Sequence, residues 1–100
     1  MEFIDLKKRA KGEIEFSEPG FIKDSDDQLN VGSLELNPTQ KVIFSVSAFK
    51  GRKYIDIRHW IQAESGGWTP TKKGVHLSFD KFGEFGKAVD IFAKIIELDK

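Results

Sequence analysis

The side chains able to do chemistry in this sequence are mainly basic and aromatic, and they recur at every second position of residues 52–60. One parity of this stretch holds Arg52, Tyr54, Asp56, Arg58 and Trp60. The other parity holds Ile55 and Ile57 and continues to Ile61. Successive side chains of a β-strand point to opposite faces, so the pattern predicts a strand with one apolar face and one basic, aromatic face. A core needs only the apolar row, and the second row therefore predicts contact with something anionic and flat.

The composition predicts a single intracellular domain. One hundred residues, 39% hydrophobic and 32% charged, are typical of a globular chain with one core, small enough that a dimer would help to bury apolar surface. The absence of cysteine excludes a disulfide framework and a thiolate metal site. No apolar run approaches the ~18 residues of a membrane span, and the N-terminus lacks the order of a signal peptide. We expect the cytoplasm or nucleoid of a bacterium, or the nucleus of a eukaryote.

The charges are distributed unevenly although the formal net charge is zero. Residues 1–40 hold five Lys or Arg against nine Asp or Glu, whereas residues 41–73 hold seven against two. A positive field confined to the middle of the chain favours an anionic partner for that segment.

The sequence predicts a partly flexible N-terminal tail over residues 1–31, with a short strand over residues 13–16. It predicts a folded domain over residues 32–100. The tail carries a basic run at residues 7–11. Such a run is read as a nuclear address or a phosphate contact in some proteins, but a solvated segment is the more frequent case. Ser25 precedes two acidic residues and is a weak candidate for phosphorylation.

The domain predicts an α+β fold of four strands followed by one helix. Residues 33–36 read as a short first strand, residues 41–49 as a second, and Lys50-Gly51 as a tight turn into the third. The fourth strand contains Val75 and Leu77, with residues 68–73 as an extended arm at the sheet edge because Pro70 cannot donate to a ladder.

From Ser78 to Leu98 the apolar period changes to that of a helix, with Ser78 as a candidate N-cap. The apolar face of this helix is wider than one sheet needs, so a partner subunit is expected to bury the surplus. The expected dimer contacts are Phe85, Ala88, Phe92 and Ile95.

The candidate binding residues combine rings for unstacked bases with cations for the sugar-phosphate chain. They are Phe49, Lys50, Arg52, Tyr54, Arg58, Trp60, Trp68, Lys72 and Lys73. Taken singly, each ring is as readily a half-buried sheet residue, and Arg58 is as readily a structural partner of Asp56. Their coincidence on one parity favours a binding face for single strands, because duplex DNA hides its base faces.

Three blocks of the chain also resemble a known family. They are Phe49-Lys50-Gly51-Arg52, then Ile55-Asp56-Ile57-Arg58 with an aromatic after it, then Pro70-Thr71-Lys72-Lys73-Gly74-Val75 before a terminal helix. Their order and spacing resemble the DNA-binding domain of the transcriptional coactivator positive cofactor four, over residues 33–98. The short mixed tail is more similar to bacterial or phage relatives.

The resemblance implies a curved four-stranded antiparallel sheet and a C-terminal helix that makes a homodimer, with two antiparallel channels for single-stranded or melted DNA. The family's DNA-contact positions fall here on Phe49, Lys50, Arg52, Arg58, Trp60 and Lys73. Trp68 stands where eukaryotic members carry a basic residue, which exchanges a phosphate contact for a stacking one.

No catalytic, metal or cofactor site is expected. His59 shares the parity of the isoleucines, where a packed histidine is more frequent than a ligand, and no nucleophile with a neighbouring base forms a motif. We expect sequence-tolerant binding of single-stranded DNA or melted duplex, in transcription regulation or in replication and repair. The alternatives are an adaptor that docks an acidic partner of the transcription machinery, such as an RNA polymerase subunit, and an RNA-binding protein.

Overall fold

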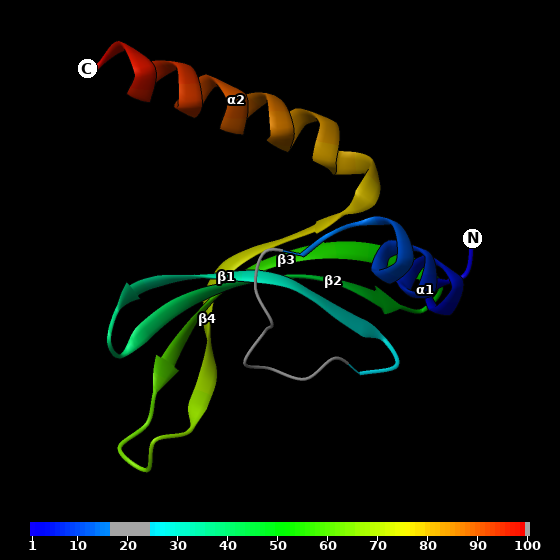
Figure 1. Ribbon diagram of the computed structural model, residues 1–100, viewed down its shortest axis with the longest axis horizontal. Helices are drawn as coiled ribbons and strands as arrows, with labels where there is room; N and C mark the ends of the chain where they lie inside the picture. Colours follow the sequence, from blue (N-terminus) through cyan, green and yellow to red (C-terminus); the bar gives the residue numbers. More distant parts are fainter. Residues whose placement is uncertain (17–24, 100) are drawn as a thin grey trace.

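The computed structural model describes residues 1–16 and 25–99 and contains one antiparallel sheet and two helices (Figure 1). The sheet has four strands in chain order, and its residue bounds are β1 Gln28–Asn37, β2 Gln40–Phe49, β3 Arg52–Gln62 and β4 Trp68–Ser78. The helices are α1 Phe3–Glu13 and α2 Phe82–Leu98, the latter preceded by the 3-10 turn η1 Phe79–Lys81. The α+β class, with four antiparallel strands and a C-terminal helix, is confirmed.

Local turn chemistry sets the order of the strands. Lys50 and Gly51 both have positive φ, 51° and 76°, which is the pattern of a type I′ turn and joins β2 to β3 with two residues. Between β1 and β2 the Asn37 side-chain oxygen accepts hydrogen bonds from the backbone N–H and the hydroxyl of Thr39. These short turns make sequence neighbours pair as strands.

The register between β2 and β3 separates the sheet into two faces. Directly opposed residues of antiparallel strands point to the same face. The first face, called the polar face below, contains Lys41, Ile43, Ser45, Ser47 and Phe49 of β2 opposite Trp60, Arg58, Asp56, Tyr54 and Arg52 of β3. The second, the apolar face, contains Val42, Phe44, Val46 and Ala48 opposite His59, Ile57, Ile55 and Lys53.

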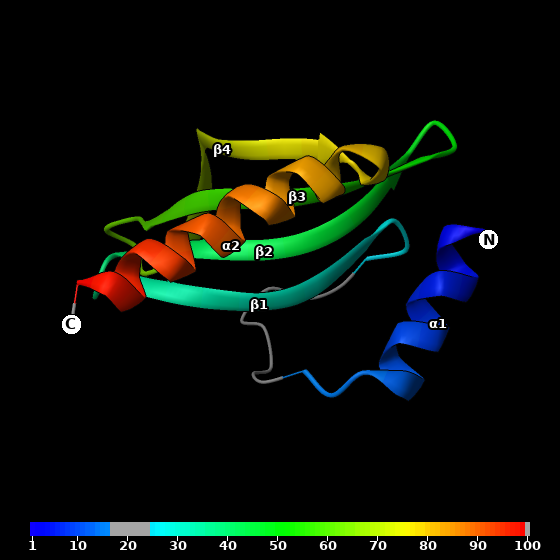
Figure 2. The ribbon, with the colours of Figure 1, turned by 90° about the horizontal axis from the view of Figure 1, so that it is seen from above.

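Both helices lie on the apolar side. Leu6 of α1 and Phe79 of η1 border the same cavity as Leu29 and Val46, which belong to the apolar face. Figures 1 and 2 show α2 over this side of the sheet, and the β1–β2 and β3–β4 turns bend away from it. The polar face is therefore the inner side of the curve, and no helix among the described residues covers it.

The N-terminal segment differs from the prediction. Residues 3–13 form a helix and residues 14–16 lie in no strand, so the expected short strand over residues 13–16 is wrong. Phe3, Leu6 and Ala10 follow helical spacing, and Phe3 is 8% exposed against the sheet. Strand β1 begins at Gln28, inside the segment assigned to the tail; of that segment, residues 17–24 lie outside the described residues.

Helix α2 contains no buried residue, although it is rich in large apolar side chains. Phe92 is 63% exposed and Leu98 84% exposed, while Phe85 is half-buried. Of the expected dimer contacts, Phe92 and Ile95 are exposed large hydrophobic residues and Ala88 is also exposed. Among residues 1–16 and 25–99, neither helix has the length and apolarity needed to cross a membrane.

Candidate nucleic-acid interface

The polar face begins at the β2–β3 hairpin tip, where Phe49 is 64% exposed. The Lys50 ammonium lies 5.3 Å from the centroid of the Phe49 ring, within the range of a cation–π contact. Arg52 is paired opposite Phe49 in the ladder and is also exposed. The tip therefore presents one ring and two cations to solvent, because the type I′ turn places the side chains of its flanking residues on the same face.

The centre of the polar face is a connected polar cluster. The Arg58 guanidinium donates through Nε to Asp56 Oδ2 at 3.2 Å and through Nη2 to Asp56 Oδ1 at 3.0 Å. Its Nη1 donates to the backbone oxygen of Thr71 in β4 at 3.1 Å. The same Asp56 Oδ1 lies 3.3 Å from Nδ1 of His76. The cluster joins β3 to β4 through side chains.

The pKa of Arg58 is raised because Asp56 accepts its hydrogen bonds, an effect that outweighs the desolvation by partial burial. The Arg58 and Asp56 side chains are 27% and 20% exposed. Three donors of Arg58 are thus engaged inside the protein, and the remaining N–H groups of its five can meet a ligand. The structural role that the sequence allowed for Arg58 is present in the fold.

A stacked pair of rings lies next to this cluster. Tyr54 and His76 have ring centroids 4.6 Å apart with an interplanar angle of 21°. His76 pairs with Asp56 across the β3–β4 ladder, so its ring reaches the polar face beside Tyr54. Sequence reasoning did not select His76 as a site residue, although its parity opposite to Val75 and Leu77 was a signal for this face.

The two tryptophans occupy the far end of the polar face. Trp60 lies opposite Lys41 of β2, and Trp68 lies opposite Gln62, two positions further along β3. The Lys41 ammonium is 4.8 Å from the centroid of the Trp68 ring. Lys41 was also missed, because it stands at a strand end and outside the basic blocks, whereas its parity with Ile43 and Ser45 assigns it here.

Lys72 and Lys73 are exposed on β4, in the segment where the register shifts between the pairs Arg58–Gly74 and Trp60–Pro70. Residues 68–73 belong to β4 itself, so the extended arm predicted there is part of a paired strand. Gly74 packs closely on β3: a Cβ at this position would collide with the backbone of Ile57. The bulge and this glycine keep the β4 backbone close to Arg58.

Ile43 and Ser45 form the floor of the polar face, with Ile43 only 5% exposed. The more apolar row of β2, with Val42, Phe44, Val46 and Ala48, lies on the opposite face, whereas Ile43 is buried on the polar side. Strand β2 is interior to the sheet, with β1 and β3 hydrogen-bonded on its two sides. The cations and rings of the face therefore surround a small apolar floor.

His59 points to the apolar side, where its ring nitrogens lie 3.0 Å from Gln40 Oε1 and 3.3 Å from Thr71 Oγ1. It is a half-buried histidine with side-chain partners. Across residues 1–16 and 25–99, no cluster of three or more His, Asp or Glu side chains with metal-binding geometry is present.

Comparison with known proteins gives one family and one fold. A search of the curated proteins found no match. A solved PC4 homologue from Burkholderia pseudomallei superposes with a TM-score of 0.60 at 18% identity, over 71% of this chain and 96% of that chain. A second crystal form of the homologue gives the same TM-score and identity over 66% of this chain and 97% of that chain. The sequence model of the family described as Transcriptional Coactivator p15 (PC4) matches residues 36–88, which include β2, β3, β4 and most of the polar face. The chain therefore belongs to the Transcriptional Coactivator p15 (PC4) family.

Proposed function

We propose that this protein binds single-stranded DNA, or the melted strands of a duplex, on the polar face of its sheet. The observation that carries the proposal is that rings and cations from β2, β3 and β4 share one face with an exposed phenylalanine at its tip. The family is one of nucleic-acid-binding coactivators rather than enzymes, which agrees with this use of the face. The proposed role lies in transcription regulation or in replication and repair, inside the cell.

The proposed mechanism divides the work between rings and cations. Unstacked bases stack on Phe49, on the Tyr54–His76 pair and on the two tryptophans at the far end of the face. Each stacked base contributes ~1 to 3 kcal/mol to the binding free energy. Phosphates are neutralised by the exposed cations Lys50, Arg52, Lys72 and Lys73. A duplex keeps its base faces inside its own stack, so it loses the ring contribution and retains only the electrostatic one. Preference for single strands follows from this difference.

The biological unit that we propose is a homodimer formed through α2. The helix exposes large apolar side chains along its length and buries none, which is unfavourable for a monomer. In an isologous interface, the α2 helices of two copies cover each other's exposed apolar side chains. Phe85, Ala88, Phe92 and Ile95 are the proposed contacts. RNA polymerase and other transcription or repair proteins are proposed as further partners, and RNA as an alternative ligand of the polar face.

The test is a fluorescence-anisotropy titration with single-stranded and double-stranded oligonucleotides of equal sequence at two salt concentrations. We expect tighter binding of the single strand than of the duplex. The logarithm of the association constant should fall linearly with the logarithm of the salt concentration, with a slope of ~0.7 per phosphate neutralised. Phe49→Ala is expected to raise the Kd by roughly 5- to 150-fold, the equivalent of one lost stacking contact.

The matched control is Ile4→Ala, which removes an exposed apolar side chain from α1, on the other side of the sheet. Its Kd should equal that of the unchanged protein. Equal affinity of the Phe49 variant and the control would remove the hairpin tip from the site. An acidic protein partner that binds without displacement by oligothymidylate would favour the adaptor function instead.

A further inference from the structure

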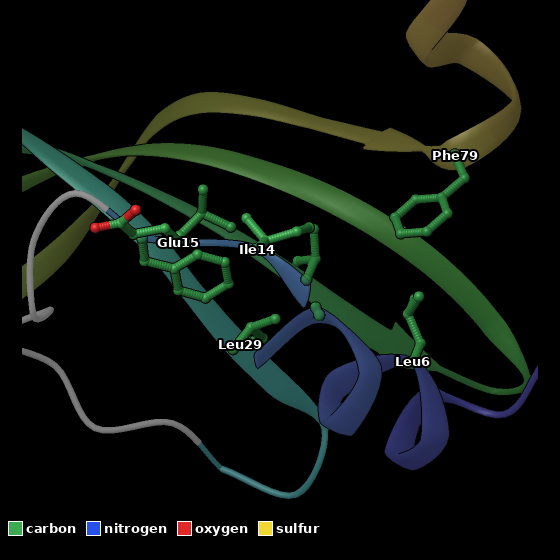
Figure 3. A pocket seen from close by; sticks show the side chains of 9 residues that line it. Leu6, Ile14, Glu15, Leu29 and Phe79 are labelled. Atoms are coloured by element: carbon green, nitrogen blue, oxygen red, sulfur yellow. The ribbon is translucent and has the colours of Figure 1, made fainter. Parts of the chain in front are cut away.

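An open apolar cavity lies under α1, outside the polar face. Its volume is about 400 Å³, and it lies between α1 with residues 14–16 after it, the apolar face of β1 and β2, and Phe79 of η1. Figure 3 shows Leu6 of α1, Leu29 of β1 and the ring of Phe79 directed toward the same space. Helix α1 precedes residues 36–88 that match the family, so this cavity is built partly by a segment that the family domain does not supply.

The protein's own C-terminal turn does not reach this cavity. Figures 1 and 2 agree that α2 starts beside η1, near α1, and ends at the opposite end of the molecule. The apolar side chains at that far end are among the most exposed large hydrophobic ones of the described residues, with Leu98 at 84% and Ile96 at 66%. An apolar cavity and an apolar helix end are thus both open, and they lie at opposite ends of one subunit.

We propose that the cavity is the seat of the C-terminal turn of α2 from a second copy of this chain, with Leu98 of the partner inserted between α1 and Phe79. This inference rests on the homodimer proposed above. Two α2 helices related by a two-fold axis across their middle run antiparallel, so the end of one lies beside the start of the other. The start of α2 adjoins Phe79, which lines the cavity.

Charge favours this arrangement. The last turn of α2 has no basic residue and contains Glu97, and Asp99 and Lys100 follow it, so a net negative side-chain charge over residues 95–100 adds to the negative end of the helix dipole. Helix α1 carries four basic side chains against two acidic ones. A parallel pairing would bring two such acidic ends together, whereas the antiparallel one places each of them beside the basic α1 and the positive start of α2. Helix α1 then acts as a clamp on the partner.

The absence of cysteine makes a cross-linking experiment direct. The double variant Ala10→Cys/Leu98→Cys places one thiol in the cavity wall and one on the helix end. After mild oxidation we expect a covalent dimer on a non-reducing gel. The matched control is Lys8→Cys/Leu98→Cys, because Lys8 lies on the same helix but borders a different depression, together with Asp26. Cross-linking at position 10 without cross-linking at position 8 supports the seat.

Sedimentation of the unchanged protein separates the possible failures. If the protein is a dimer but gives no cross-link at position 10, or an equal cross-link at position 8, the proposed place of the C-terminal turn in the cavity is wrong, while the proposed dimer is retained. A monomer overturns both, while the oligonucleotide titration still decides DNA binding on its own.

Leu98→Ala gives a second measurement that does not depend on added thiols. Leu98 is almost fully exposed within its own subunit, so its truncation should not unfold the chain. We expect the dimer dissociation constant to rise on the order of 100-fold, because a two-fold dimer loses two buried leucine side chains and each contributes roughly tenfold. Lys87→Ala, on the same helix, should leave that constant unchanged. Equal constants for the two variants would overturn the proposal.

Discussion

Arg58→Ala should destabilise the fold, because the Arg58 side chain links β3 to β4. The guanidinium makes two hydrogen bonds to Asp56 and one to the Thr71 carbonyl, and both charged side chains are mostly covered. Exposed ion pairs contribute ~0 to 1 kcal/mol and breaking a fully buried pair costs ~3 to 5 kcal/mol. A pair that is 27% and 20% exposed lies between these limits, so we expect the free energy of unfolding to fall by about 2 kcal/mol.

Urea denaturation followed by circular dichroism measures this loss. The midpoint should fall with the m-value unchanged, and Tm should fall by roughly 8 to 16 °C for a domain of this size. All variants are compared at one protomer concentration, since the proposed dimerisation would make apparent stability concentration-dependent.

Arg52→Ala is the matched control for Arg58→Ala, because Arg52 lies on the same strand and face but is exposed at the hairpin tip. Its removal should change stability by less than ~0.5 kcal/mol, as expected for a surface substitution, while weakening DNA binding. Equal stability losses for the two arginine variants would show that the Arg58–Asp56 pair is solvated and would refute its assignment as a link between β3 and β4.

Two further substitutions test the frame of the polar face. Gly74→Ala should destabilise the β3–β4 pairing by more than the ~1 kcal/mol of a simple glycine replacement, because the added methyl meets the backbone of β3; thermal unfolding measures it. The Ser78 hydroxyl donates to Asp80 and holds the pKa of that carboxyl below its usual value, so Ser78→Ala should raise it in a carboxyl NMR titration. A group with a lowered pKa stabilises the fold above its unfolded pKa and loses this contribution as the pH falls through its folded pKa, so the effect on stability is confined to acid.

The alternation of residues 52–60 was enough to predict the polar face, because strand parity is a local property that neighbouring strands only confirm. The β2–β3 turn was equally local, since Gly51 can adopt positive φ. The terminal helix was predicted because apolar residues recur at helical spacing over a long segment. These features need no knowledge of distant contacts.

The features that sequence reasoning missed depend on irregular pairing. Strand β1 starts early, but a register shift between Asn30 and Gly32 interrupts its alternation, so only residues 33–36 read as a strand. A similar shift opposite His59 hid the continuity of β4 through Pro70, which an edge strand tolerates. Helix α1 was missed because the basic run dominates its sequence and its apolar stripe is short. The stability of such a short helix depends on packing of that stripe against the sheet, which the local sequence does not show.

The polar face contains two kinds of side chain, and they should contribute differently to binding. Tyr54, His76, Asp56 and Arg58 already contact one another, so a ligand meets a surface whose geometry is set in advance and costs little side-chain entropy to order. Phe49, Lys50 and Arg52 are exposed at the tip and lose more freedom when they bind. In the proposed complex, the cluster would therefore set where a strand lies, whereas the tip, with its exposed ring and cations, would supply salt-dependent affinity. Because α1 and α2 lie on the other side of the sheet, substitutions that open the proposed dimer should reduce avidity for long strands and leave the affinity of one face for a short oligonucleotide unchanged.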